Sequence, residues 1–168
     1  YFMTALKPPT GARNNPFLRA VDATCPADLL ARARHSPARH IAFVRAIGGA
    51  ILATARDAMH HQLAVPVLVG EPEQMRADAA AIGWDLAGVE LVPAVGEQEA
   101  IDAAIGLVGA GAAAGLIKGQ LHSDVFMGGI VKRQAGIRTD QRLLHIFAML
   151  PPGGGRPLLI SDAAVNVA

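Results

Sequence analysis

The sequence is poor in cysteine, in aromatic residues and in charge of either sign. Its single cysteine, Cys25, has no partner for a disulfide within the chain, so a reducing compartment is the default expectation. Aromatic residues make up 4% of the chain and the formal net charge is +1. Base-stacking surfaces and strong phosphate-backbone binding are therefore disfavoured, and we expect no nucleic-acid partner.

Long apolar runs are also missing. No stretch approaches the roughly 18–20 consecutive apolar residues of a membrane-spanning helix, so we expect no membrane partner. The first residues lack the basic stretch and apolar core of a secretory signal, and we expect a cytoplasmic protein. His60 and His61 are adjacent on an expected helix and would point apart, so we expect no metal site there.

Small apolar residues and glycine are abundant instead. The 168 residues are 52% hydrophobic, and 18 glycines separate the apolar runs. Short apolar segments typical of β-strands alternate four times with segments whose apolar residues have helical spacing. This pattern predicts an α/β fold with a parallel sheet covered by helices on both faces. The expected strands are 40–44, 65–70, 89–92 and 113–117, and the helices that follow them are 49–62, 72–82, 97–108 and 123–133.

The end of the chain has a different pattern. Two apolar runs, 142–150 and 158–161, flank a Pro- and Gly-rich loop and predict an antiparallel strand pair that belongs to a second, incomplete domain. Tyr1 and Phe2 precede Met3 and are interpreted as remnants of an expression tag. The expected parts are an N-terminal arm, a first α/β domain and the start of a second domain, at 1–23, 24–122 and 123–168.

The segment from Gly115 to Asp124 is the main candidate for function. It predicts a buried strand, a loop at Lys118 and Gly119, and a helix that begins at Ser123. Free backbone N–H groups, a positive helix end and an ammonium group would together form an anion site. Two simpler interpretations stay open: Lys118 is a solvated lysine at a strand end, and Ser123 with Asp124 only caps the helix.

Five motifs follow one another along the chain. They are "GAAAGLIKG" at 111–119, "LHSD" at 121–124, "GIRT" at 136–139, "LHIF" at 144–147 and "LLISDAAVN" at 158–166. In combination they resemble the phosphate acetyltransferase and phosphate butyryltransferase family. The upstream β-α pattern fits the same family, so the resemblance extends over about residues 24–168.

The resemblance implies an activity and a fold. Family members transfer an acyl group between coenzyme A and phosphate, with acyl-CoA and phosphate in equilibrium with CoA and acyl phosphate. Their fold is similar to that of isocitrate and isopropylmalate dehydrogenases, with a cleft between two domains. Coenzyme A would be a substrate, with no further cofactor and no metal, and a homodimer or higher homo-oligomer is expected. Family chains are about twice this length, so this chain would be the N-terminal half, inactive alone, with the main catalytic residues beyond Ala168.

The resemblance also implies which residues bind phosphate or substrate. These are Lys118, Gly119, His122, Ser123, Arg138, Thr139, Asp162 and Asn166. The forked guanidinium of Arg138 suits an anion, and His122 would donate a hydrogen bond to an oxyanion. Alternatively, His122 stabilises its own loop, and Asp162 and Asn166 satisfy the backbone of a tight turn.

One position departs from the family pattern. Gly128 stands where family members often carry an arginine, which lowers the anion affinity expected of this chain. Gly128 and Gly129 also weaken the expected helix by roughly 1 kcal/mol each. Either the helix ends early, or close packing requires small residues there.

Two other functions remain open. One is a non-catalytic acyl-CoA-sensing domain of the same ancestry. The other is an α/β domain that binds a different phosphate-bearing ligand.

Overall fold

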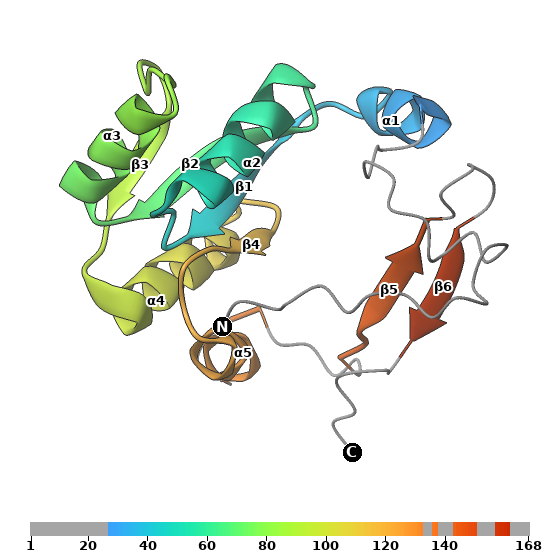
Figure 1. The fold of residues 1–168 in the computed structure, drawn as a ribbon. Helices are drawn as coiled ribbons and strands as arrows, with labels where there is room; N and C mark the ends of the chain where they lie inside the picture. Colours follow the sequence, from blue (N-terminus) through green and yellow to red (C-terminus); the bar gives the residue numbers. More distant parts are fainter. Residues whose placement is uncertain (1–26, 133–135, 138–142, 151–156, 162–168) are drawn as a thin grey trace, which may run out of the picture. The chain divides into compact units, whose positions relative to one another are not determined.

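The computed structural model describes residues 27–132, 136–137, 143–150 and 157–161. The chain divides into two compact units, 31–140 and the combination of 1–30 with 141–168, and each is described by itself. The described helices and strands, shown in Figure 1, are α1 Ala27–Arg34, β1 Arg39–Val44, α2 Gly49–His60, β2 Ala64–Gly70, α3 Pro72–Ala81, β3 Glu90–Pro93, α4 Gly96–Gly109, β4 Leu116–Lys118, α5 Ser123–Val131, β5 Ile146–Met149 and β6 Leu158–Ser161.

The larger unit is built on a four-stranded sheet in the order β3-β2-β1-β4, in which every neighbouring pair is parallel. The chain steps outward from β1 to β2 and β3, then returns to the free side of β1 to add β4. Right-handed crossovers place helices on opposite faces when the direction of winding reverses. Accordingly, α2 and α3 cover one face and α4 the other (Figure 1), which confirms the predicted α/β fold.

Neighbouring residues of β1 enter two different cores. Ala42 and Val44 are buried against residues of α4, whereas Phe43 is buried with residues of α2 and α3. Successive side chains of a strand point to opposite faces, so a strand covered on both sides must be apolar throughout. This explains why the strands read as continuous apolar runs.

The fourth strand begins three residues later than predicted. The amide of Ala113 donates to the Leu107 carbonyl at 3.1 Å and closes the end of α4, where Gly111 has a φ of 73°. A left-handed glycine commonly ends a helix in this way. The regular strand β4 therefore runs only from Leu116 to Lys118, although Ala114 and Gly115 already form backbone hydrogen bonds with His40 and Ala42 of β1.

The helix after β4 contains two glycines with different surroundings. A Cβ atom at Gly129 would lie 2.5 Å from Cγ1 of Ile101 in α4, so α5 packs on α4 through a position that requires glycine. A Cβ atom at Gly128 would meet nothing within 4 Å. Close packing thus explains Gly129 but not Gly128, and α5 ends at Val131 rather than at residue 133.

The smaller unit contains the predicted antiparallel pair. Ile146 of β5 is paired with Ser161 of β6, and Met149 with Leu158. β5 is shorter than the predicted 142–150, and all four residues of each strand are exposed. None of the helices in the described ranges combines the length and the hydropathy that crossing a bilayer demands.

Gly119 provides a test of how β1 and β4 approach each other. A Cβ atom at this residue would lie 2.5 Å from the carbonyl oxygens of Val44 and Arg45, and both obstacles are backbone. We expect Gly119→Ala to lower the free energy of unfolding by about 1–3 kcal/mol, measured by urea denaturation. Gly106→Ala in α4, where nothing lies within 4 Å, should raise it by roughly 0.5–1 kcal/mol. Unchanged stability of Gly119→Ala would contradict the close approach.

Candidate functional site

The candidate site lies where the carboxyl ends of β1 and β4 meet. Winding of the sheet reverses between these two strands, and ligands of open α/β sheets bind outside the carboxyl ends at such a point. Val44 and Lys118 are register partners there. A hollow of about 260 Å³ opens beside them, lined by Arg45, Glu97, Lys118, Gly119, Gln120, Leu121 and His122.

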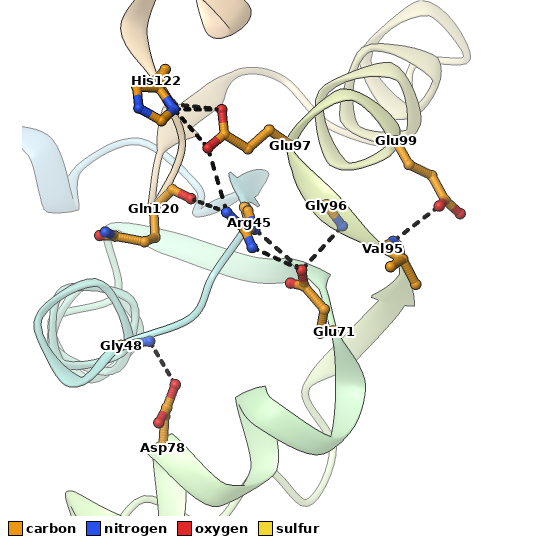
Figure 2. Close-up of polar contacts among 10 residues, drawn as sticks. All are labelled: Arg45, Gly48, Glu71, Asp78, Val95, Gly96, Glu97, Glu99, Gln120 and His122. Carbon is orange, nitrogen blue, oxygen red and sulfur yellow. Dashed lines mark hydrogen bonds and ion pairs between the residues drawn. The ribbon is translucent and has the colours of Figure 1, made fainter.

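Arg45 is the central side chain of this edge, as Figure 2 shows. Its Nε and Nη2 donate to Oε1 of Glu71 at 3.2 and 3.1 Å. Its Nη1 donates to the Gln120 carbonyl at 3.2 Å and lies 3.5 Å from Oε1 of Glu97. The backbone of Arg45 is left-handed, with a φ of 51°, and a non-glycine residue persists there only when its surroundings hold it. One half-buried guanidinium therefore joins segments that follow β1, β2, β3 and β4.

Glu71 forms the second part of the network. Besides Arg45, its Oε1 accepts the Gly96 amide at the start of α4, at 3.0 Å. Burial acts to raise the pKa of Glu71, but hydrogen bonds from the Gly96 amide, its own amide and Arg45 lower it by more, so its pKa lies below the ordinary value. Glu71 is therefore ionised at neutral pH and balances the charge of Arg45.

Glu97 forms the third part, through His122. Its Oε2 accepts the His122 amide at 3.0 Å, and its two oxygens lie 2.8 and 3.0 Å from Nδ1 of the ring. The hydrogen bond from the His122 amide is the largest cause that lowers the pKa of Glu97; burial opposes it, and the His122 ring and Arg45 add to it. The sequence-based expectation that Ser123 caps α5 is wrong, because His122 occupies the cap position and no side-chain cap bond forms. Glu97 reaches across from α4 instead.

The structure separates the roles expected of Lys118 and Gly119. The Gly119 amide donates to the Val44 carbonyl at 2.9 Å, so the expectation that it is free to bind an anion is wrong. Lys118 is exposed, and within the described ranges its ammonium pairs with no carboxylate. At the start of α5, no described acceptor reaches the amides of Ser123 and Asp124. Among the described residues, the hollow therefore contains one cation, Lys118, that pairs with no carboxylate, and the start of α5 follows His122 at its edge.

The structure brings together only part of the expected site. Lys118, Gly119 and His122 line the hollow, and Ser123 is the next residue, where α5 begins. The other expected residues, Arg138, Thr139, Asp162 and Asn166, lie outside the described residues and stay predictions. Within the ranges described, no three His, Cys, Asp or Glu side chains gather as they would around a metal ion.

Sequence reasoning missed three charged residues. Arg45 directly follows β1, Glu71 directly follows β2, and Glu97 lies in the first turn of the helix after β3. Their common signal is a charged residue just beyond the carboxyl end of a strand, which is the edge where α/β proteins bind ligands.

Replacing Arg45 tests the network. Arg45→Met leaves Glu71 and Glu97 without their shared cation, so we expect the free energy of unfolding to fall by about 1–3 kcal/mol in chemical denaturation. Arg56→Met is the matched control, because Arg56 pairs with one carboxylate, the exposed Asp57 beside it, and donates one hydrogen bond to the Ile82 carbonyl, so its effect should stay within about 1 kcal/mol. Equal losses in the two variants would argue against a special role of Arg45.

The two lowered pKa values predict a pH dependence. Each carboxyl group has a lower pKa in the folded chain than its ordinary 4.5, so its stabilisation is fully present above pH 4.5 and disappears as the pH falls through the folded-state pKa. The stability difference between the native chain and Glu71→Gln should therefore be largest above pH 4.5 and shrink in acid. Glu73→Gln, at an exposed neighbour, is the control. A difference that grows in acid would contradict the assignment.

The sequence is similar to those of known acyltransferases. No protein-family model matches the chain. The chain is 30% identical over 164 residues to the phosphate acetyltransferase of Rickettsia typhi, covering 98% of this chain and 46% of that protein. It is 28% identical over 139 residues to the phosphate butyryltransferase of Clostridium beijerinckii, covering 83% and 46%.

The fold has a solved counterpart. The EutD phosphotransacetylase from Staphylococcus aureus matches with a TM-score of 0.65 at 19% identity, over 83% of this chain and 51% of that one. At this identity the match establishes the fold alone. Sequence and fold together make the chain similar to phosphate acetyltransferases and butyryltransferases, and it spans about half the length of the curated relatives it matches.

Proposed function

We propose that this chain forms part of a phosphate acyltransferase, which transfers an acetyl or other short acyl group between coenzyme A and inorganic phosphate. Similarity to acetyl- and butyryltransferases over most of the chain supports the reaction class. The structural observation that carries the proposal is the ammonium of Lys118, which pairs with no carboxylate in the described part of the chain and shares a hollow with His122 where the sheet reverses its winding.

The reaction needs groups that position anions. Phosphate attacks the thioester carbonyl, or the CoA thiolate attacks an acyl phosphate, and both paths gain mainly from positioning and from stabilising an oxyanion. Lys118 and the free amides at the start of α5 provide positive potential for a phosphate group. Arg45 is not the anion ligand in this proposal, because Glu71 and Glu97 already neutralise its charge.

The proposal includes residues at the end of the chain. Arg138 and Thr139 would supply a second anion contact, and Asp162 and Asn166 would orient the substrate. The domain boundary would fall near residue 122, with the remaining catalytic groups supplied by sequence that corresponds to the second half of the relatives. Support comes from the family-like motifs and from the half-length match.

Partners and location are also part of the proposal. Coenzyme A acts as a substrate rather than a bound cofactor, and the protein is cytoplasmic. A homodimer is proposed because β5 and β6 expose apolar side chains, such as Ile146 and Leu159 at 57% and 64% of their surface. Light scattering after size-exclusion chromatography measures the oligomeric state.

Phosphate binding tests the site in the chain itself. We expect Lys118→Met to weaken phosphate binding roughly tenfold in isothermal titration calorimetry, because one charge-assisted hydrogen bond is lost. Lys132→Met makes the same charge change at a lysine that faces Asp102 at 3.6 Å and does not line the hollow, so it should leave affinity unchanged. Equal affinities of the native chain and Lys118→Met would refute the assignment.

Turnover tests the reaction. We expect no CoA release from acetyl-, propionyl- or butyryl-CoA with phosphate by the chain alone. Release should appear when the chain is joined to the matching C-terminal half of the Rickettsia typhi relative. CoA binding without release in this fusion would favour an acyl-CoA-sensing domain, and turnover by the chain alone would contradict the half-site proposal.

A further inference from the structure

We propose that Arg45 is a positioning residue for the hollow beside β4, and that it acts by holding the peptide groups of Gln120 rather than by contacting an anion. Residues 119–121, which we call the connector, link Lys118 at the end of β4 to His122 before α5. The contacts between Arg45 and the connector follow from the geometry. Only the identity of the ligand, a phosphate group, rests on the proposed acyltransferase function.

Arg45 contacts Gln120 at two points. Its backbone carbonyl accepts the Gln120 amide at 3.0 Å, and its Nη1 donates to the Gln120 carbonyl at 3.2 Å. Figure 2 shows the second of these contacts. The neighbouring residues are held by other means, because the Gly119 amide donates to the Val44 carbonyl and the Leu121 side chain is buried in the core that includes α4. Arg45 therefore holds the middle of the connector.

The Gln120 carbonyl depends on the side chain of Arg45. Among the described residues, no second donor forms a hydrogen bond to this oxygen. If this peptide group rotated, the direction in which the chain leaves the connector would change. The distance between the side chains of Lys118 and His122, which both line the hollow, would change with it. Arg45 thus fixes the spacing of two side chains that it does not itself contact.

Two carboxylates hold the guanidinium in the orientation that this contact requires. Nε and Nη2 donate to Oε1 of Glu71 at 3.2 and 3.1 Å, and Nη1 lies 3.5 Å from Oε1 of Glu97. A planar fork meets Glu71 with one edge and Gln120 with another, whereas the single ammonium of a lysine cannot reproduce this geometry. The carboxylates also balance the charge of Arg45, so an external anion gains little from it directly.

The backbone of Arg45 is fitted to the same contact. Its φ of 51° is left-handed, which costs free energy in a residue other than glycine. In this conformation its carbonyl accepts both the Gln120 amide and the Ile47 amide, at 3.0 and 2.9 Å. The next amide, that of Ala46, donates to the Val69 carbonyl at 2.9 Å and ties this segment to β2. The guanidinium is therefore anchored to the sheet at its base as well as at its tip.

Hydrogen exchange tests the contact on the chain without ligand. In Arg45→Lys, which keeps the charge, we expect the Gln120 amide to exchange faster, because the carbonyl of the same residue has lost its donor. The reference is the Ala42 amide, which donates to the Gly115 carbonyl at 3.0 Å within the sheet. The ratio of the Gln120 rate to the Ala42 rate, measured by NMR, should rise about tenfold.

This ratio separates a local role from a general one. A loss of overall stability alone does not raise the ratio, because it speeds the exchange of the Ala42 amide at least as much. Arg56→Lys is the matched control, since Arg56 donates to the Ile82 carbonyl away from the connector, and it should leave the ratio unchanged. An unchanged ratio in Arg45→Lys would overturn the proposal.

Phosphate binding separates positioning from direct contact. In isothermal titration calorimetry we expect Arg45→Lys and Arg45→Met to weaken phosphate binding equally, by about three- to tenfold, because both lose the hold on Gln120. If the guanidinium bound the anion itself, the lysine variant would keep the charge and bind more tightly than the methionine variant. That result would overturn the proposal, and so would native affinity in both variants.

Removing Glu71 gives a test with the opposite sign. If charge alone mattered, loss of this carboxylate would strengthen phosphate binding. Because Glu71 orients the guanidinium, we expect Glu71→Leu to weaken binding about threefold instead. Glu73→Leu is the matched control, because it removes the same charge from an exposed residue that is not bonded to Arg45, and it should not weaken binding. Stronger binding by Glu71→Leu would contradict the positioning role.

The two kinds of measurement distinguish this proposal from the proposed function. The exchange ratio involves neither phosphate nor CoA, so it decides the contact between Arg45 and Gln120 by itself. If the ratio rises in Arg45→Lys while the native chain binds no phosphate, the function proposed for the hollow fails and the positioning of the connector by Arg45 stands.

Discussion

The ion pair between Arg45 and Glu71 is the interaction on which the rest of this edge depends. It lies between the ends of two neighbouring strands, and each partner extends the contact to a further element: Arg45 to Gln120 and Glu97, and Glu71 to the Gly96 amide. Burial disfavours the charge of Glu71, and its Oε2 has no hydrogen-bond partner among the described residues, so the contacts of Oε1 with Arg45 and the Gly96 amide offset that cost. The network fixes the starts of α4 and α5 before any ligand arrives.

Backbone packing and charge cooperate at this point. Gly119 lets the chain after β4 lie directly against the carbonyls that end β1, so its amide closes the sheet instead of facing a ligand. As a result, the Gly119 amide is not available to a ligand. Arg45 and Glu71 join the ends of β1 and β2, and Glu97 contacts His122. Among the residues that the structure describes, no carboxylate pairs with the ammonium of Lys118.

Much of the fold could be predicted from the sequence, because the spacing of apolar residues indicates which faces of a strand or helix are buried. The four parallel strands and the late antiparallel pair were found, with errors at strand ends such as the start of β4, where a backbone bond to Leu107 decides the boundary. Less of the site could be predicted. A motif pointed to Lys118 and His122, which line the hollow and whose binding roles stay predictions. Arg45 and Glu97 lie far apart in the chain and become neighbours only through the sheet order.

The paired strands β5 and β6 have one further consequence. Adjacent residues of β5, such as Ile146 and Phe147, point to opposite sides of the ribbon, and both are exposed and apolar. Covering one side would leave the other in water. A surface that buried this ribbon fully would therefore have to contact both of its faces. The exposed apolar side chains of β5 and β6 thus constrain the packing on both faces of the ribbon.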